Sequence, residues 1–181
     1  RWQHPVLGRL LPGEFLPLAA SAGLGEALTR VAIRDAIDIA ARWQAGDRPL
    51  AITVNLAAAD LRDGTLPGYV QAQLADGGIQ PAQLTLEVGE EDVMAEPAAV
   101  LPVLTALREA GVQLALDDFG TGRSSLAWLA RLPLTELKLD RAFVSGLARD
   151  PARQVVARAA LDLARQFGLQ SVAVGVEDPA T

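Results

Sequence analysis

Apolar residues change their spacing repeatedly along the 181-residue chain, and each change predicts a new element. From residue 26 to residue 44 they recur every three or four positions, which is the period of an amphipathic helix. Residues 50–56 form a short apolar run that is typical of a buried strand. The same reading predicts further helices at 69–74, 97–109, 124–132 and 151–167, and further strands at 84–88, 112–116, 136–139 and 171–176.

The alternation of strands with helices predicts parallel βαβ units. Two architectures have this order, a doubly wound open sheet and a (β/α)8 barrel. A nucleotide-binding open sheet usually carries a G-x-G-x-x-G fingerprint after its first strand, and none follows residues 50–56. A complete barrel has about 250 residues, so this chain is about one or two strands short. We therefore predict an α/β fold in the form of an incomplete TIM-like (β/α)8 barrel.

Polar residues lie at or near the ends of four successive predicted strands: Asn55, Glu87, Asp117 with Asp118, and Lys138. Each has an ordinary structural explanation. Asn55 suits a turn or a helix cap, and the two aspartates suit a cap of the following helix. Glu87 can point into solvent from an edge strand, and Lys138 can extend its ammonium to the surface. Parallel strands, however, bring their carboxyl ends together, which favours one shared site.

The chemistry of this set suits hard divalent cations. One amide oxygen and three carboxylates are ligands that Mg²⁺ and Mn²⁺ prefer and that suit zinc less well. Adjacent aspartates allow one carboxylate to bridge two cations while its neighbour completes the second position. Two such cations position a hydroxide and stabilise the leaving oxygen of a phosphodiester, and a lysine nearby holds the attacking water. The pattern therefore indicates metal-assisted phosphoryl hydrolysis.

Composition narrows the class of protein. The chain has no cysteine and one histidine, His4, which excludes disulfides, thiolate metal sites and a multi-histidine zinc site. Its formal net charge is −6 and it has no basic tract, so duplex nucleic acid is not an expected partner. Charged residues interrupt every apolar run before the length that spans a bilayer. We therefore expect a cytoplasmic domain.

Several motifs together resemble the EAL domain of bacterial cyclic di-GMP signalling. The resemblance runs through RWQHP at 1–5, LLPGEFLPLAASAGL at 10–24, VNL at 54–56, LTLEVGEED at 84–92, ALDDFGTGRSSLAWLARLPLTELKLDRAF at 115–143 and VAVGVE at 172–177. The combination of DDFGTG-x-SSL with LK-[IL]-D-R-x-F is highly specific. The resemblance implies a TIM-like barrel of the EAL type that hydrolyses cyclic di-GMP to linear pGpG with two Mg²⁺ or Mn²⁺ ions.

The resemblance also assigns a role to each polar strand-end residue by its position in the motifs. Asn55, Glu87 and Asp117 would be ligands of the first metal ion. Asp117 would bridge to the second ion, which Asp118 would also hold. Lys138 would contact the hydrolytic water.

Four further residues receive roles from the same resemblance. Glu90 matches a glutamate that steadies the loop shaping the metal site and the dimer contacts. Arg1 would reach a phosphate of the ligand. Asp140 and Glu177 would lie near a guanine or its supporting network.

One departure from the family pattern bears directly on activity. Val174 stands where the family has a glutamate that helps to hold the second metal ion and its water. A valine neither ligates a metal nor accepts a proton, and removing such a group typically costs about 10²–10³-fold in rate. We therefore predict impaired hydrolysis, in a domain that acts as a cyclic di-GMP-binding or regulatory module. As a binding module alone, the domain would require no cofactor. The alternative is an active phosphodiesterase that depends on Mg²⁺ or Mn²⁺.

The domain organisation is also an expectation from the resemblance. Residues 1–181 are expected to form one EAL-like domain that lacks the first strand, with its Glu-Ala-Leu motif, and the C-terminal strand region. We expect a longer parent protein, in which GGDEF, PAS or other sensory domains and a membrane anchor are compatible neighbours. The resemblance also implies a homodimer.

Overall fold

The structure is a computed structural model that describes residues 1–44, 50–120 and 125–177. The helices are α1 Pro12–Ser21, α2 Gly25–Trp43, α3 Leu66–Gly77, α4 Glu90–Ala95, α5 Pro97–Glu109, α6 Leu126–Leu129, α7 Arg141–Val144 and α8 Pro151–Gln166. The strands are β1 Trp2–His4, β2 Gly8–Leu10, β3 Ile52–Asn55, β4 Leu84–Gly89, β5 Gln113–Phe119, β6 Glu136–Leu139 and β7 Gln170–Ala173. Short 3-10 turns occupy Asp60–Arg62, Pro81–Gln83 and Leu147–Arg149.

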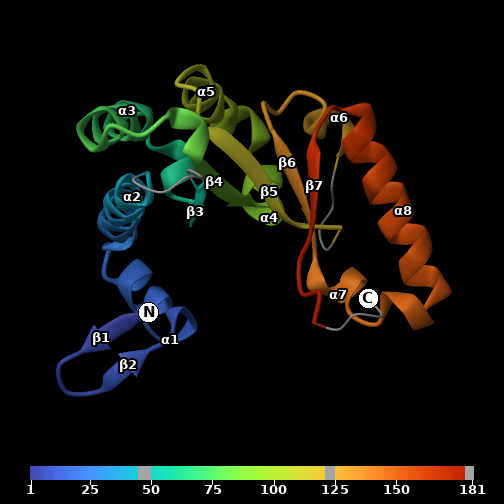
Figure 1. The fold of residues 1–181 in the computed structure, drawn as a ribbon, viewed down its shortest axis with the longest axis horizontal. Helices are drawn as coiled ribbons and strands as arrows, with labels where there is room; N and C mark the ends of the chain where they lie inside the picture. Colours follow the sequence, from blue (N-terminus) through green and yellow to red (C-terminus); the bar gives the residue numbers. More distant parts are fainter. Residues whose placement is uncertain (45–49, 121–124, 178–181) are drawn as a thin grey trace.

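Five parallel strands form the central sheet in the order β3-β4-β5-β6-β7. This spatial order equals the order in the chain, so the sheet winds in one direction. A doubly wound sheet instead reverses at a switch point, and its ligand binds there. Across the described strands there is no reversal, and the sheet has the winding of a barrel segment (Figure 1). The predicted α/β fold is therefore confirmed.

The strand register gives the sheet one apolar face and one polar face. Val54, Leu86 and Leu114 share one row, whereas Asn55, Glu87 and the next position on β5 share the adjacent row. Successive rows project to opposite faces because side chains alternate along a strand. The apolar face contributes buried core residues from four strands: Val54, Leu84, Leu86, Val88, Leu114, Leu116, Leu137 and Leu139.

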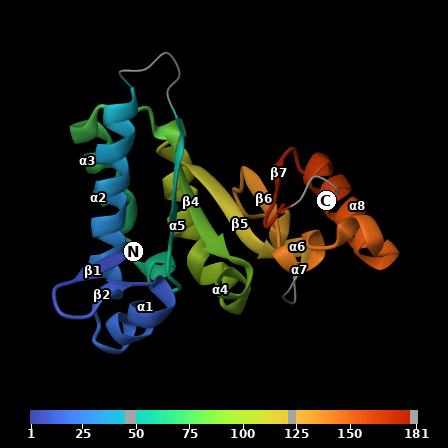
Figure 2. The same ribbon diagram turned by 60° about the horizontal axis from the view of Figure 1, so that its bottom comes forward.

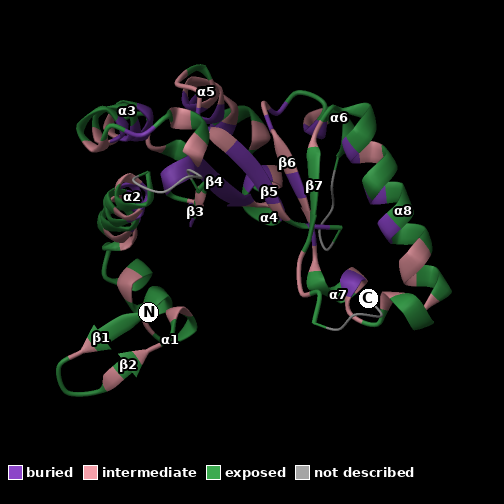
Figure 3. Cartoon of the chain, in the orientation of Figure 1, coloured by how far each residue is buried: buried purple, intermediate pink, exposed green. Residues whose placement is uncertain are grey.

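Helices pack on the apolar face of the sheet. Contacts join α2 to β3, α5 to β5, and α8 to both β6 and β7. Figure 1 shows these helices along the outer side of the sheet, and Figure 3 shows the buried residues concentrated in β4 and β5. The opposite, polar face is left for the site. In the part of the chain that the structure describes, no helix is both long enough and apolar enough to cross a membrane.

The last strand is shorter than the apolar pattern predicts. The predicted strand at 171–176 ends at Ala173, and a turn follows. Gly175 adopts a φ of 82°, which side-chain-bearing residues rarely adopt. A Cβ added there would lie 2.6 Å from Cγ of Arg141, so the stem of this arginine occupies the space beside the glycine.

The N-terminal elements were not predicted. β1 and β2 form an antiparallel hairpin in which Nδ1 of His4 accepts the amides of Val6 and Leu7 at 3.1 and 3.0 Å. Figure 2 shows the hairpin and α1 together beside one end of α2. Strands of three residues are too short to display a period of two. Their turn is stabilised by local side-chain hydrogen bonds that periodicity does not report.

Candidate functional site

The polar face brings together side chains from the carboxyl ends of the strands. Asn55 lies opposite Glu87 across β3 and β4, and Gly89 lies opposite Asp117 across β4 and β5. Glu87 and Gly89 are two residues apart, so all four positions face the same side. The interpretation of Glu87 as a solvent-facing residue of an edge strand is wrong, because β4 is an inner strand and Glu87 is 7% exposed.

A β-bulge near the end of β5 presents the two aspartates together. The register with β6 shifts between Leu116 and Phe119, so Asp117 and Asp118 lie across from Lys138 alone. Asp118 has a φ of 56°, the one positive value among the described non-glycine residues. Such strain costs about 1–3 kcal/mol and concentrates at functional sites.

The interpretation of these aspartates as caps of the following helix is wrong. Asp117 and Asp118 belong to β5, whereas α6 begins at Leu126. Its cap residue is Ser125, and within the described chain no side-chain hydrogen bond caps this helix. Residues 121–124, the centre of the DDFGTG-x-SSL motif, lie outside the described residues.

The ammonium of Lys138 is the counter-charge of the polar face. It forms an ion pair with Glu87 and lies 3.7 Å from Oδ1 of Asp117. Burial lowers the pKa of Lys138, but the hydrogen bond to Glu87 and the charges of Glu87, Asp117 and Glu136 outweigh burial and hold this pKa above its usual value. The Lys138 side chain is 16% exposed, so its interpretation as a residue that extends to the surface is wrong.

Asp118 and Asp140 form an acid pair beside the bulge. Burial raises the pKa of Asp118, and the charge of Asp117 and a hydrogen bond with Asp140 raise it further. Oδ1 of Asp140 also accepts the amide of Ala142 at 2.7 Å, which caps α7. Two neighbouring carboxylates need a shared proton or a cation to offset their repulsion. The pair therefore indicates a position that suits positive charge.

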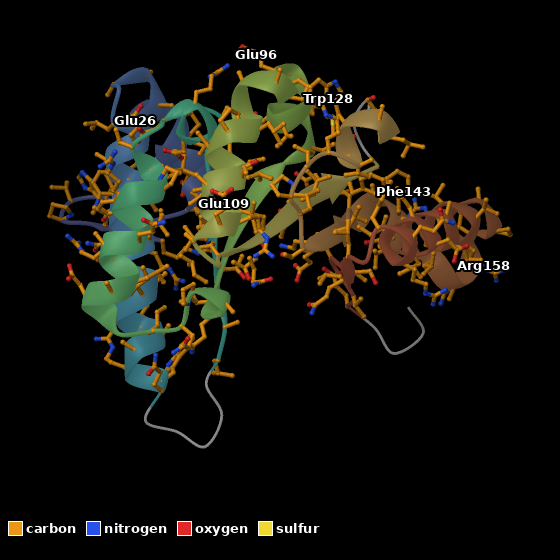
Figure 4. All side chains as sticks on the ribbon, turned by 90° about the horizontal axis from the view of Figure 1, so that it is seen from above. Glu26, Glu96, Glu109, Trp128, Phe143 and Arg158 are labelled. Atoms are coloured by element: carbon orange, nitrogen blue, oxygen red, sulfur yellow. The ribbon has the colours of Figure 1, made fainter. Side chains whose placement is uncertain are left out.

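Glu90 ties α4 to the end of β5. It is 1% exposed, and its Oε2 accepts the amide of Gly120 at 2.8 Å. Gly120 has a φ of 100°, and a Cβ there would lie 2.9 Å from Cε2 of Phe143. Figure 4 labels Phe143 among the elements that follow β5. Glu90 thus contacts the second residue after the aspartates, at the point where β5 has ended.

The variant Glu90→Ala is expected to lower the free energy of unfolding by about 2–3 kcal/mol, because the amide of Gly120 loses a charged acceptor that is itself buried. The measurements are urea unfolding and hydrogen exchange of the Gly120 amide, which we expect to accelerate. The control is Glu91→Ala, since Glu91 is exposed on the same helical turn. Equal losses of stability in the two variants would contradict this role of Glu90.

Two residues predicted to touch the ligand lie apart from the polar face. Arg1 is exposed before β1, and among the described residues no hydrogen bond or ion pair joins it to the polar strand ends. Glu177 forms an ion pair with Nη2 of Arg141 at 2.8 Å, and both side chains are more than 60% exposed. An exposed pair of this kind is worth little, so Glu177 is free to exchange its partner.

Val174 lies at the carboxyl end of the sheet. Its amide donates to the carbonyl of Leu139 at 3.1 Å, so the pairing of β7 with β6 continues to this residue. Val172 lies opposite Lys138, and Val174, two residues further, follows it on the polar face. The residue that follows Leu139, directly after the neighbouring strand β6, is Asp140. A half-buried hydrocarbon side chain therefore stands beside the acid pair.

The polar strand ends have the donor chemistry of a site for a hard divalent cation. Oδ1 of Asp117 is buried and has no hydrogen-bond partner among the described residues, an arrangement that a cation relieves. No group of three histidine, cysteine, aspartate or glutamate side chains in the described ranges is spaced to hold a metal ion. The positive charge next to Glu87 and Asp117 is instead the ammonium of Lys138. The donor types fit, and Lys138 is the competing cation.

One polar residue of this face was missed by the sequence analysis. Glu136 begins β6, opposite Ala115, in the row that contains Asn55 and Glu87. Burial raises its pKa, which the charge of Lys138 partly offsets. Its position two residues before Lys138, in the alternating sequence ELKL, was the available signal.

Comparisons with known proteins identify similar sequences over almost all of the chain. The EAL domain family model matches residues 1–181. "Cyclic di-GMP phosphodiesterase PA2567" of Pseudomonas aeruginosa is 38% identical over 177 residues, which cover 98% of this chain and 30% of that protein. "Bifunctional diguanylate cyclase/cyclic di-GMP phosphodiesterase MucR" of the same species is 39% identical, with 99% of this chain and 26% of that protein covered. The chain thus spans less than a third of the length of these relatives.

Solved structures share the arrangement of this chain. "PaMucR Phosphodiesterase, c-di-GMP complex" has a TM-score of 0.92 and 39% identity, and the match covers 99% of this chain and 73% of that one. The FimX EAL domain from Pseudomonas aeruginosa bound to c-di-GMP has a TM-score of 0.90 and 23% identity, with 99% and 72% covered. The second likeness concerns the fold alone. Within this fold, the candidate metal ligands of this chain lie with Lys138 on the polar face of the sheet.

Proposed function

The chain belongs to the EAL domain family, and from this membership we propose that it recognises cyclic di-GMP and hydrolyses it slowly. The names of two similar proteins describe cyclic di-GMP phosphodiesterases, and the similar MucR structure is described as a c-di-GMP complex. The polar face of this chain carries oxygen donors and a lysine of the kinds that such chemistry uses. The proposal therefore combines a retained recognition site with a weakened catalytic one.

Four oxygen donors would hold the divalent cations, Mg²⁺ or Mn²⁺: Asn55, Glu87, Asp117 and Asp118. When bound, these cations supply an activated water and stabilise the charge that develops on the phosphodiester. Lys138 lies close enough to Glu87 and Asp117 to direct its ammonium at a phosphate oxygen or at the attacking water.

Residues beyond the metal ligands would orient the nucleotide. Arg1 offers a guanidinium for a phosphate, and Asp140 and Glu177 offer carboxylates to the edge of a guanine. Glu177 and its partner Arg141 are exposed and available for such exchange. Glu90 positions the amide of Gly120, and it supports the end of β5 rather than touching the reacting atoms.

The single observation that carries impaired hydrolysis is the valine at the carboxyl end of β7. Val174 follows the pairing of β7 on the polar face and lies next to Asp140, where a carboxylate would add to the acid pair. Its methyl groups offer no oxygen to a cation or to water. The second metal position thus lacks a donor on the side formed by β7.

An active, metal-dependent phosphodiesterase is the second candidate, and one observation favours it. Oδ1 of Asp117 is buried without a hydrogen-bond partner among the described residues, as expected of a cation ligand. The side chains of Asn55, Glu87 and Lys138 also face the same side. Under this alternative, the loss at Val174 is tolerated.

Calorimetry and a hydrolysis assay with purified protein separate these possibilities. We expect cyclic di-GMP to bind in the presence of Ca²⁺ or Mg²⁺, and pGpG to form slowly with Mg²⁺ or Mn²⁺. Rapid formation of pGpG supports the active enzyme. Absence of cyclic di-GMP binding, with and without metal, contradicts both candidates and leaves a structural role for the domain.

The wider setting of the domain remains a set of predictions from the family resemblance. Residues 1–181 are taken as a single EAL-type domain that contributes five barrel strands and lacks the first and the C-terminal strand regions. A homodimer, neighbouring GGDEF, PAS or other sensory domains, and a cytoplasmic location are proposed on the same ground. Cross-linking of the full-length protein tests the homodimer.

A further inference from the structure

Glu136 occupies a central place on the polar face that no role above explains. It lies in the same row as Glu87, and the strand between them contributes only Ala115 at this level. Two strand spacings therefore separate the backbones of Glu87 and Glu136 by about 10 Å. The alanine is 0% exposed and has no side chain beyond its methyl group. The space over β5 between the two glutamates is therefore left to longer side chains from neighbouring positions.

Lys138 is placed to reach either glutamate. It follows Glu136 by two residues on β6, so both side chains leave the same face with their Cα atoms about 7 Å apart. Its ammonium at present pairs with Glu87, across β5. The four-carbon stem of lysine is flexible, and its charge is compact. A change of partner from Glu87 to Glu136 requires rotation of this stem and no movement of the backbone.

The charges on this face favour such an exchange. Lys138 faces the carboxylates of Glu87, Asp117 and Glu136, and the charges of all three act on it. The carboxylate of Glu136 has no hydrogen-bond or ion-pair partner among residues 1–44, 50–120 and 125–177. Burial raises the pKa of Glu136 and the charge of Lys138 lowers it, while Glu87 and Asp117 raise it. An ammonium released from Glu87 thus has an unoccupied carboxylate within reach.

We propose that Glu136 is a second anchoring carboxylate for Lys138, which holds the ammonium over the polar face whenever Glu87 is engaged elsewhere. The exchange itself depends only on the described side chains. Its functional meaning rests on the proposed function, because a divalent cation on Glu87 is the event that would release Lys138. Glu136 then acts as a positioning residue: it keeps the ammonium beside the site instead of allowing it to turn into solvent.

The sequence offers a direct probe of this exchange, because Lys138 is its one lysine. Protein labelled with ¹⁵N-lysine gives a single side-chain ammonium signal, which is sharp while the ammonium is held in an ion pair and broadens when it exchanges with water. We expect a sharp signal in the wild type, in Glu136→Gln and in Glu87→Gln. We expect the signal to broaden beyond detection in Glu87→Gln/Glu136→Gln.

The control keeps Glu136 and removes a distant glutamate. Glu26 is exposed in the first turn of α2, and Figure 4 places its label among the N-terminal helices, far from that of Phe143. Glu87→Gln/Glu26→Gln is expected to keep the sharp signal. If the signal is lost in the single variant Glu87→Gln, the proposal is overturned. If the signal persists in the double variant Glu87→Gln/Glu136→Gln, the proposal is also overturned, and the anchor is then Asp117. Backbone amide spectra show that each variant is folded.

A second comparison uses Mg²⁺ and needs no change at Glu87. In the wild type we expect the Lys138 signal to shift on addition of Mg²⁺ and to stay sharp, whereas in Glu136→Gln we expect it to broaden. Broadening in both proteins overturns the anchoring role of Glu136. If Mg²⁺ leaves the signal unchanged in both, the metal site of the proposed function fails, and the result in Glu87→Gln still decides the anchor.

Discussion

Replacement of Val174 with glutamate is expected to raise the rate of cyclic di-GMP hydrolysis by about 10²–10³-fold. The amide of Val174 continues the pairing of β7 with β6, and the residue lies next to Asp140 at the carboxyl end of the sheet. A glutamate there adds a carboxylate beside the Asp118–Asp140 pair, where a second cation lacks a donor. Formation of pGpG with Mg²⁺ or Mn²⁺ measures the effect.

Geometry supports this gain without rearrangement of the strand. Val172 lies opposite Lys138 on the polar face, and Val174 follows it by two residues. Glu177 does not substitute, because it is exposed and paired with Arg141 beyond the turn at Gly175. Moving its carboxylate into the sheet would require a slip of register, and a slip of one residue reverses the faces of a strand.

Two variants separate a new metal ligand from other effects. Val174→Gln has the shape of the glutamate without its charge, and we expect a gain of less than tenfold. Val176→Glu adds the charge at an exposed position beyond Gly175, and we expect no gain. If Val174→Glu leaves the rate unchanged while cyclic di-GMP still binds, the site is impaired elsewhere, and the assignment of the defect to Val174 is wrong.

The main features of the sheet could be predicted from the sequence because apolar runs and helical periods report burial locally. Residues 84–88 and 136–139 were predicted as strands, and the structure has strands at Leu84–Gly89 and Glu136–Leu139. The helix at 97–109 was predicted with its observed bounds, since Pro97 begins it and Gly111 follows its end. The hairpin of β1 and β2 was missed because three-residue strands carry no periodic signal.

The sequence predicts which residues belong to the site better than it predicts which of them pair with each other. Asn55, Glu87, Asp117 and Lys138 were predicted to share one edge because parallel strands end together, and the register confirms that they do. Which groups pair depends on alignment between strands that are distant in sequence.

Two details of the site show this limit. The bulge at Asp118 places two aspartates across from one lysine. The sequence pattern does not reveal where a strand contains a β-bulge. The alternation in ELKL puts Glu136 on the same face as Lys138, but its place in the row of Glu87 follows only from the alignment of β6 with β5.

Removal of the ammonium in Lys138→Met is expected to lower the free energy of unfolding by about 2–3 kcal/mol at neutral pH and without added divalent cation. Breaking a buried ion pair costs about 3–5 kcal/mol because the remaining charge is uncompensated, and the partial exposure of Lys138 reduces this cost. The charge left behind is Glu87, which is 7% exposed, and Asp117 loses the same counter-charge. Urea unfolding measures the loss.

The dependence on pH has a defined sign. The pKa of Lys138 is raised in the folded protein, so its contribution is complete below the pKa of an unfolded lysine and is lost as pH rises through the folded value. As the pH rises through the folded pKa of Lys138, the difference between wild type and Lys138→Met should therefore shrink. The double variant Glu87→Leu/Lys138→Met removes both charges and should recover most of the stability, since an apolar pair of similar volume replaces a buried ion pair at little cost. A double variant less stable than Lys138→Met contradicts this account, because the loss would then follow from packing around the lysine stem and not from an unpaired charge on Glu87.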